Sequence, residues 1–315
     1  MVTSSTARKL HLAVAQLGPV QRADSRKQVV LRLLELLKDA ASRGAAWVTF
    51  PELALTTFFP RWDMDDSAEI RAFFETEMPG PETRPLFDAA RELSVGFYLG
   101  YAELDGDRQF NTSILVGRDG TILGKYRKIH IPGDAATVSG AALQHLEKKY
   151  FAVGDLGFPV WETPDAKIGM CICNDRRWPE TFRVMGLQGV DVVMNGYNTP
   201  SGYVQWNEPI HLRMHHHLLS LQSAAYQNAC WIASAAKAGV EEGSPMIGGS
   251  AIVAPTGEVM VRTFSEDDEV INFVCDLSVC EYYRANIFNF AAHRRPEHYG
   301  LILERTGAGA PLARP

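Results

Sequence analysis

The order of secondary structure in the first fifty residues constrains the fold more than any other feature of this chain. Residues 10–16 alternate in polarity and favour a strand, which ends at Gly18-Pro19. Apolar side chains then recur every three or four residues between 29 and 37, which predicts a helix, and Asp24 is expected to cap it. A short apolar strand at 47–50 follows. A strand, a helix and a strand in this order predict a sheet with helices packed on it.

The rest of the chain continues this alternation. The patterns predict helices at 82–93, 179–189 and 210–228, and strands at 95–101, 110–116, 121–125, 168–173, 190–194, 231–235, 250–254, 259–263 and 269–276. The strand–turn–strand sequence at 113–123 resembles that at 250–260, and each follows a strand, a helix and a strand. Two similar halves predict an α/β fold in which two sheets pack face to face between helices, a four-layer αββα sandwich.

Charge and composition narrow the possible functions. The chain has 315 residues, 46% of them hydrophobic, which is enough for a large core. Its 31 basic and 37 acidic residues give a formal net charge of −6 without a basic stripe, so nucleic acid is not expected as a partner. The apolar runs are too short to cross a membrane. The first ten residues lack an export signal and the five cysteines include no C-x-x-C pair, so we expect a cytoplasmic protein with reduced thiols.

Cys173 is the strongest candidate for a nucleophile. It ends an apolar strand and precedes the polar string Asn174-Asp175-Arg176-Arg177, after which a helix begins. A thiol at such a turn is expected to expose its sulfur, and the helix N-terminus and the two arginines are expected to lower its pKa toward the thiolate. The alternative is a small buried core residue, the commoner fate of a cysteine. That alternative better suits the other four cysteines, Cys171, Cys230, Cys275 and Cys280.

Two further residues are candidates for acyl-transfer chemistry. Glu52 follows a strand at the rim of the predicted sheet, where apolar surroundings would raise the pKa of its carboxyl group for general-base catalysis. Lys128 lies in a basic segment and, if buried, would stabilise an oxyanion. The alternatives are a solvated loop glutamate and a surface lysine on an edge strand. His130 offers another route, a Cys–His pair with Cys173, for which the sequence gives no geometry.

A metal site is not expected. His211 and His215 are four residues apart on a predicted helix, a spacing that suits a metal, but no H-E-x-x-H glutamate or third ligand accompanies them. With His216 and His217, they are expected to lie on a helix face or at a subunit interface. The sequence has no G-x-x-x-x-G-K-[ST], no G-x-G-x-x-G after a strand and no G-x-S-x-G serine elbow.

Three blocks together resemble the nitrilase superfamily of carbon-nitrogen hydrolases: Phe50-Pro51-Glu52, Lys125-Tyr126-Arg127-Lys128-Ile129-His130 and Cys171-Ile172-Cys173-Asn174-Asp175. They occur in the order of that superfamily, with Lys128 76 residues after Glu52 and Cys173 a further 45 residues on. The resemblance implies a nitrilase-like αββα sandwich, a Glu–Lys–Cys triad and no metal or organic cofactor. It extends over most of the chain, so we expect an N-terminal extension at 1–9, a single carbon-nitrogen hydrolase domain at 10–303 and a flexible C-terminal tail at 304–315.

Longer strings resemble the N-carbamoyl-D-amino acid amidohydrolases, the D-carbamoylases of that superfamily. These strings lie at 51–62, 144–148, 174–181 and 196–200. The catalytic residues that the resemblance implies are Glu52 as base, Lys128 as oxyanion holder, Cys173 as nucleophile and Glu147 as supporting carboxylate. The substrate-binding residues that it implies are His145, Asn174, Arg176, Arg177, Asn198 and Thr199. Two consecutive arginines beside the nucleophile suit a substrate that carries a carboxylate.

The implied activity is hydrolysis of the ureido C–N bond of N-carbamoyl-D-amino acids, through an acyl-enzyme, to the free D-amino acid, ammonia and carbon dioxide. The substrate is a small molecule, and a homodimer or homotetramer is expected. Two alternatives remain open: a related amidase or β-ureidopropionase-type enzyme that acts on another amide, and a non-catalytic binding protein on the same fold. Segments 132–142, 202–208 and 244–247 differ from the D-carbamoylase pattern, which leaves side-chain and stereochemical preference open.

Overall fold

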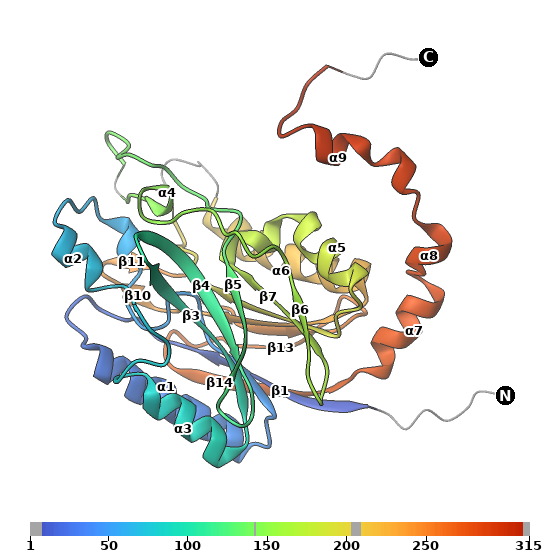
Figure 1. Cartoon of the computed structure of the whole chain (residues 1–315), viewed down its shortest axis with the longest axis horizontal. Helices are drawn as coiled ribbons and strands as arrows, with labels where there is room; N and C mark the ends of the chain where they lie inside the picture. The colour runs from blue at the N-terminus through green and yellow to red at the C-terminus, as the bar shows by residue number, and fades with distance from the viewer. Residues whose placement is uncertain (1–7, 142, 203–208, 311–315) are drawn as a thin grey trace.

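The computed structural model describes residues 8–141, 143–202 and 209–310, and two six-stranded sheets form its centre (Figure 1). In the order β14-β1-β2-β3-β4-β5, the first sheet contains β1 (Lys9–Gln16), β2 (Trp47–Thr49), β3 (Gly96–Asp105), β4 (Arg108–Val116), β5 (Ile122–Arg127) and β14 (Glu269–Asp276). In the order β13-β12-β9-β8-β7-β6, the second sheet contains β6 (Val160–Glu162), β7 (Lys167–Ile172), β8 (Val192–Tyr197), β9 (Trp231–Ala236), β12 (Ala251–Val253) and β13 (Val259–Arg262).

The two sheets share one topology. In the first sheet the parallel strands β1, β2 and β3 lead into the antiparallel hairpin β4–β5. In the second, the parallel strands β7, β8 and β9 lead into the antiparallel hairpin β12–β13. Both hairpins carry a register shift at the matching position, Leu115/Val116 in one and Ile252/Val253 in the other. The two similar passages of the sequence therefore occupy equivalent places in the two sheets.

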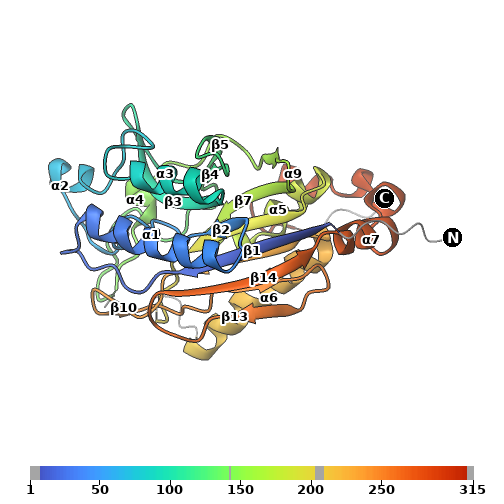
Figure 2. The same ribbon diagram turned by 90° about the horizontal axis from the view of Figure 1, so that it is seen from below.

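Helices cover the outer face of each sheet, so the molecule has the predicted four layers (Figures 1 and 2). α1 (Arg26–Ser42) and α3 (Arg84–Leu93) pack on the first sheet, and α5 (Pro179–Leu187) and α6 (Ile210–Asn228) pack on the second. Side chains alternate accordingly along β1: Ala13 and Ala15 lie in the core with α1, whereas Leu12 and Val14 lie in the core between the sheets. The αββα sandwich is confirmed.

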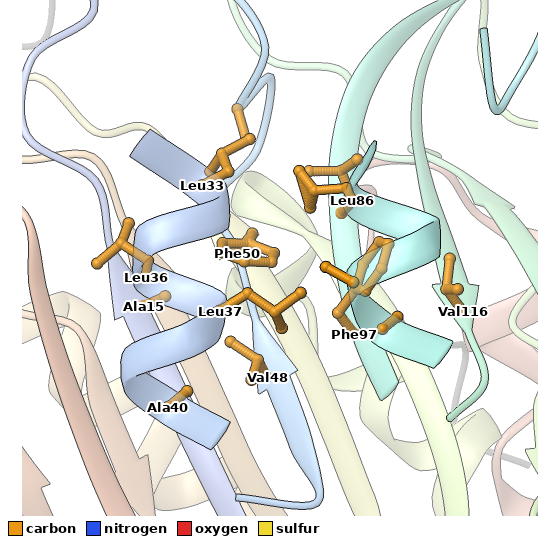
Figure 3. Close-up of a cluster of buried hydrophobic side chains, with 14 of the residues drawn as sticks. Ala15, Leu33, Leu36, Leu37, Ala40, Val48, Phe50, Leu86, Phe97 and Val116 are labelled. Carbon is orange, nitrogen blue, oxygen red and sulfur yellow. The ribbon is translucent and has the colours of Figure 1, made fainter. Parts of the chain in front are cut away.

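One face of α1 is anchored to the first sheet by the apolar residues that define the helical periodicity. Leu33, Leu37 and Ala40 project from α1 toward Val48 of β2 and the neighbouring Phe50 (Figure 3). All are buried, and burial of side chains of this size is the main source of the stability of such a layer. Phe50 ends this layer two residues before Glu52, so the packing of α1 also fixes the start of the segment that carries the predicted base.

The predicted element bounds are correct for some elements and wrong for others. α6 and β14 have the predicted bounds. The cap of α1 is Ser25, not Asp24, because the Ser25 side chain accepts from the Gln28 N–H and the Gln28 side chain accepts from the Ser25 N–H. β7 ends at Ile172, and Cys173 begins a short 3₁₀ helix instead of ending the strand.

Several elements were not expected from the sequence. They are α2 (Ser67–Arg71), α4 (Glu147–Tyr150), β10 (Val240–Glu241), β11 (Ser244–Pro245), α7 (Ser278–Asn286), α8 (Phe290–His293) and α9 (Gly300–Glu304), together with β6. The last three helices form a C-terminal arm that curves away from the two sheets (Figure 1). Arg284 anchors its base by donating to Val190 O at 2.6 Å and to Asp191 Oδ1 at 2.8 Å.

The hairpin β10–β11 fixes the segment that follows Glu52. Glu241 of β10 is fully buried, and its Oε1 accepts from the Arg61 guanidinium at 2.7 Å and from the Phe58 N–H at 2.6 Å. Lys237 donates to Oε2 of the same carboxylate at 3.1 Å. This buried charge cluster holds the chain after the Glu52 turn against the second half of the molecule.

Parts of several predicted segments lie outside the described residues: 1–7 of the N-terminal extension, 142 and 203–208 of the divergent loops, and 311–315 of the tail. Within the residues that the structure describes, none of the helices combines the length and apolar character needed to cross a membrane.

Candidate active site

Glu52 lies in a turn that is enclosed by both sheets. A Cβ atom at Gly100 of β3 would lie 2.8 Å from Glu52 Cα, and one at Gly196 of β8 would lie 2.5 Å from Glu52 N. Any side chain at either position would therefore displace the turn, and glycine at both lets the backbone of Glu52 approach both sheets. The Glu52 side chain is fully buried as a result.

The Lys128 ammonium joins two buried carboxylates. Lys128 follows β5, and its N–H donates to Asn111 O at 2.8 Å, which continues the strand pairing by one residue. Its Nζ lies 2.7 Å from Glu52 Oε1 and 2.5 Å from Oε2 of Glu147, the first residue of α4. Both contacts lie in the interior, where ionisable groups are rare and often functional. The solvated-glutamate and surface-lysine alternatives are therefore wrong.

The charges within this cluster shift the pKa values of Lys128 and Glu147. Burial lowers the pKa of Lys128, but the Glu147 and Glu52 carboxylates outweigh it and hold that pKa well above its ordinary value. Burial raises the pKa of Glu147, but Lys128 and His145 outweigh it and bring that pKa to about 2. Lys128 is therefore a cation and Glu147 an anion throughout the neutral range.

Cys173 occupies a strained turn at the end of β7. Its φ of 48° lies in the left-handed region, which non-glycine residues seldom adopt and which is often found at functional sites. Its Sγ lies 3.7 Å from Asn198 O and 3.6 Å from Arg176 Nη1. The side chain is buried, so the expectation of an exposed sulfur is wrong.

The expected lowering of the Cys173 pKa is also wrong. Burial and the charge of Glu52 raise the pKa of the thiol, and Lys128 and Arg176 offset only part of this rise. The sequence pattern indicates the arginines but not the depth at which the sulfur lies, and desolvation of a thiolate is the larger effect here. A thiol that stays protonated at neutral pH needs a base to become nucleophilic.

The residues that follow β8 contact both sides of the cluster. The Asn198 N–H donates to Glu52 Oε2, and its side-chain amide donates to the Glu52 carbonyl, each at 2.9 Å. Arg176 lies buried behind Cys173, where it donates to Cys173 O at 2.6 Å and to Thr199 Oγ1 at 2.9 Å. Its Nε donates to His217 Nδ1 at 3.0 Å. Asn198 and Arg176 therefore brace the predicted base and the predicted nucleophile.

The other three predicted substrate-binding residues differ in position. His145 Nε2 lies 2.8 Å from Glu147 Oε1, so His145 belongs to the buried cluster. Asn174 is half-buried and donates from Nδ2 to His130 O at 3.0 Å. Arg177 is also half-buried, in contrast to Arg176. The structure thus brings His145 and Asn198 to the charged cluster, sets Arg176 and Thr199 behind Cys173, and leaves Asn174 and Arg177 more exposed.

No role is predicted from the sequence for Asp175, yet it organises the turn of the nucleophile. Its buried carboxylate accepts from the Tyr126 hydroxyl at 2.7 Å, the His130 N–H at 2.9 Å and the Ile172 N–H at 3.0 Å. His130 Nδ1 lies 2.8 Å from the same carboxylate. The His130 ring thus bonds to Asp175, and within the described part of the chain it makes no hydrogen bond with Cys173. This arrangement disfavours the Cys–His pair.

Asn111 of β4 is a second residue without a predicted role. Its Nδ2 lies 2.8 Å from Glu52 Oε1 and 3.4 Å from Glu147 Oε2, the two oxygens that also contact Lys128. The signal in the sequence is the polar run Asn111-Thr112-Ser113 inside a strand that a four-layer sandwich covers on both faces. Such a run needs buried hydrogen-bond partners, but the sequence does not identify them.

The histidines of α6 do not form a metal site in the structure. His211 and His215 are exposed on this helix, and His217 is buried against Arg176. Across residues 8–141, 143–202 and 209–310, no group of three or more His, Cys, Asp or Glu side chains is arranged to hold a metal ion.

Comparison with known proteins identifies the family. Residues 11–285 match the family model described as "Carbon-nitrogen hydrolase". The chain is 32% identical over 266 residues to a nitrilase of Pyrococcus abyssi, covering 84% of this chain and 90% of that protein. It is 30% identical over 283 residues to an N-carbamoylputrescine amidase of Arabidopsis thaliana, covering 86% of this chain and 89% of that protein.

The fold is shared with solved structures. A carbon-nitrogen hydrolase from Helicobacter pylori superposes with a TM-score of 0.82 at 23% identity, covering 94% of this chain and 99% of that chain. An amidase from Nesterenkonia superposes with a TM-score of 0.69 at 18% identity, covering 92% of this chain and 99% of that chain. The chain therefore belongs to the carbon-nitrogen hydrolase family of the nitrilase superfamily, whose members hydrolyse carbon–nitrogen bonds other than peptide bonds.

Proposed function

We propose that this chain hydrolyses N-carbamoyl-D-amino acids to the free D-amino acid, ammonia and carbon dioxide, with Cys173 as the nucleophile. The observation that carries the reaction type is the buried cluster in which the Lys128 ammonium contacts Glu52 and Glu147, and in which Asn198 contacts both Glu52 and the Cys173 sulfur. The resemblance of segments 51–62, 174–181 and 196–200 to D-carbamoylases supports the substrate.

The acylation step follows from the charges of these groups. Glu52 takes the proton of the Cys173 thiol, and the thiolate attacks the ureido carbon. Two of the three N–H donors of Lys128 are used by Glu52 and Glu147, which leaves one donor, counted over the described residues, for the oxyanion. The N–H of Asn174 supplies a second oxyanion contact. The tetrahedral intermediate collapses when Glu52 returns the proton to the departing amine nitrogen.

Deacylation uses the same base. Glu52 takes a proton from water, and the resulting hydroxide attacks the carbonyl of the S-thiocarbamate that joins Cys173 to the substrate. Collapse of this second intermediate breaks the S–C bond, and the proton returns to the thiolate of Cys173. The carbamic acid that is released decomposes to carbon dioxide and an amine. The net reaction consumes water and restores the free enzyme.

The positive charge beside the nucleophile favours an anionic substrate. Arg176 is buried behind Cys173, and Arg177 follows it in a half-buried position. We assign the substrate carboxylate to Arg177, the more accessible of the two, with Arg176 adding positive charge beside the nucleophile. The remaining predicted binding residues, His145, Asn174, Asn198 and Thr199, then border the carbamoyl group or its attachment.

The direct test is ammonia release from N-carbamoyl-D-alanine and from its L-enantiomer by the wild type and by Cys173→Ala. We expect D-selective release that disappears in the variant. Equal rates with both enantiomers would contradict the stereochemical part of the proposal. No release from either enantiomer by folded wild type would contradict the substrate assignment, and the family membership would stand.

A second candidate is a related amidase, including the β-ureidopropionase type. Several relatives are described as N-carbamoylputrescine amidases, for example those of Arabidopsis thaliana and Solanum lycopersicum. N-carbamoylputrescine carries a terminal ammonium and no carboxylate, so the positive charge of the two arginines disfavours it. Competition between the two substrates in one assay distinguishes the two candidates. Faster hydrolysis of N-carbamoylputrescine would support the second.

We further propose that residues 10–303 work as one domain in a cytoplasmic homodimer or homotetramer. The support is the set of exposed apolar side chains on α5 and on the C-terminal arm, such as Val184 and Leu187 on the former and Ile302 and Leu303 on the latter. Light scattering of the purified full chain tests this assembly. A monomer at micromolar concentration would contradict it.

A further inference from the structure

The side-chain amide of Asn111 contacts the same two carboxylate oxygens as the ammonium of Lys128. Asn111 Nδ2 lies 2.8 Å from Glu52 Oε1 and 3.4 Å from Glu147 Oε2. Lys128 Nζ lies 2.7 Å and 2.5 Å from these oxygens. The backbone carbonyl of Asn111 also accepts a hydrogen bond from the Lys128 backbone N–H at 2.8 Å. One residue therefore contacts Glu52, Glu147 and the backbone of Lys128.

The orientation of the Asn111 amide follows from its surroundings. If the amide were rotated by half a turn, its Oδ1 would face two carboxylate oxygens, which repel it, so the nitrogen must point to the carboxylates. Oδ1 is buried and has no hydrogen-bond partner among the described residues. Leaving a buried acceptor unsatisfied is unfavourable. An apolar side chain of similar size would fill the same space without this penalty. The presence of an asparagine therefore indicates that the contacts of its Nδ2 have a function.

The neutral charge of this donor is suited to the proposed chemistry. The centre contains one ammonium, Lys128, and two carboxylates, Glu52 and Glu147, all buried. A second cation in place of Asn111 would bind the carboxylate of Glu52 so strongly that it would take up the thiol proton poorly. A neutral amide fixes the carboxylate in space and leaves it able to accept and return a proton.

We propose that Asn111 is a positioning residue. Its amide holds the carboxylates of Glu52 and Glu147 in contact with the Lys128 ammonium, so that Glu52 can take the proton of Cys173. This inference rests on the proposed roles of Glu52 as base and Cys173 as nucleophile. Asn111 acts through Glu52 and is not itself a catalytic residue.

Other charged and titratable groups face the same centre. Apart from Lys128, Glu147 and Cys173, they are Tyr98 and Lys237 near Glu52, His145 beside Glu147, and Arg176 near Cys173. Replacement of Asn111 by alanine changes none of these charges. A change in the pH dependence of that variant therefore reports the lost amide contacts and not a lost charge.

The test follows alkylation of Cys173 by iodoacetamide as a function of pH, with the modified peptide identified by mass spectrometry. In this reaction the Cys173 sulfur forms a bond to carbon, iodide leaves, and Glu52 takes the thiol proton. Asn111→Ala and the near-isosteric Asn111→Asp are compared with the wild type and with Asn195→Ala. Asn195 is a suitable control because it is also a fully buried asparagine in a strand, bonded to Ser234 Oγ at 2.8 Å.

We expect both Asn111 variants to alkylate at least roughly tenfold more slowly at pH 7, and the pH profile of Asn111→Ala to differ in shape from that of the wild type, because the amide no longer donates to the two carboxylates. Asn195→Ala should keep the wild-type profile. A wild-type profile in folded Asn111→Ala would overturn the inference. Failure of both Asn111 variants to fold would also overturn it, because Asn111 would then have a structural role.

This experiment separates the inference from the proposed function. Iodoacetamide requires the thiol and its base but no N-carbamoyl substrate. A wild type that alkylates at Cys173 and releases no ammonia from N-carbamoyl amino acids would contradict the substrate assignment, and the Asn111 profiles would still decide the positioning role.

Discussion

Asn198 holds Glu52 at two points, through its N–H to Glu52 Oε2 and through its side-chain amide to the Glu52 carbonyl, each at 2.9 Å. The carbonyl of Asn198 also lies 3.7 Å from the Cys173 sulfur. The proposed base and the proposed nucleophile follow strands of different sheets, β2 and β7, and a single residue after β8 contacts both. This arrangement explains why segments far apart in the chain must fold together before the site exists.

Replacing Asn198 by alanine should therefore impair the chemical step more than substrate binding. The variant loses the amide contact to the Glu52 carbonyl, and we expect kcat to fall about tenfold, the equivalent of one hydrogen bond of about 1.4 kcal/mol. KM should change by less than about threefold. Asn228→Ala serves as the control, since Asn228 is a buried asparagine whose amide donates to Ala224 O within α6. A large rise in KM with unchanged kcat would contradict this account, because Asn198 would then contribute to substrate binding alone.

The two consecutive arginines should behave differently. Arg177→Ala should raise KM at least about tenfold for N-carbamoyl-D-alanine and leave the kinetics of an uncharged amide, propionamide, unchanged, because a carboxylate contact is worth more than 1.4 kcal/mol. Arg176→Ala should lower kcat for both substrates, since Arg176 donates to Cys173 O at 2.6 Å. Steady-state kinetics with both substrates decide. Equal effects of Arg177→Ala on both would remove Arg177 from carboxylate recognition.

Asp175→Asn should disturb the turn of the nucleophile. The Asp175 carboxylate accepts from Tyr126, His130 and Ile172, and an amide places N–H groups against some of these donors. We expect a loss of about 1–3 kcal/mol in the free energy of unfolding, with a clear fall in kcat. Tyr126→Phe removes only one donor and should lose about 1 kcal/mol. Urea unfolding and kcat measure both effects, and a stable, fully active Asp175→Asn would exclude this role.

Acid should destabilise the protein through Glu147. Burial raises the pKa of this carboxyl group, but Lys128 and His145 bring it to about 2 from an ordinary value of 4.5. The unfolded chain therefore binds this proton at higher pH than the folded protein. The stabilisation is complete above about pH 4.5, on the order of 3 kcal/mol, and is lost as the pH falls toward 2.

The measurement is the free energy of unfolding in urea from pH 7 down to pH 3, for the wild type and for Glu147→Gln. We expect the wild type to lose stability more steeply below about pH 4.5 than the variant, because the variant has no carboxyl group to protonate at this position. Parallel curves for the two proteins would show that Glu147 does not contribute the predicted stabilisation.

Much of the fold can be predicted from the sequence because the spacing of apolar residues indicates most of the helices and strands. The bounds of α6 and β14 match the predicted ones, and the two similar passages at 113–123 and 250–260 correspond to equivalent hairpins. The C-terminal arm could not be predicted in this way. Its helices are at most nine residues long and bury few side chains, and Leu303 is 92% exposed.

The site is harder to predict than the fold. The residue types at Glu52, Lys128 and Cys173 are visible in the sequence, but their burial is not, and burial reverses the expected direction of the Cys173 pKa. The role of Asn111 depends on contacts with residues 59 and 36 positions away. Such long-range contacts follow from the packing of two sheets and leave no local pattern.

The central claim is that Cys173, and not another buried thiol, forms the acyl-enzyme. Its direct test is mass spectrometry of protein that has been mixed with N-carbamoyl-D-alanine, quenched in acid and digested, for the wild type, Cys173→Ala and Cys171→Ala. Cys171 is the matched control because it lies two residues earlier in β7, buried in the core beneath α5 and α6. We predict a substrate adduct on the peptide with Cys173 in the wild type and in Cys171→Ala, and none in Cys173→Ala. Continued ammonia release by Cys173→Ala, or an adduct on Cys171, would contradict the account.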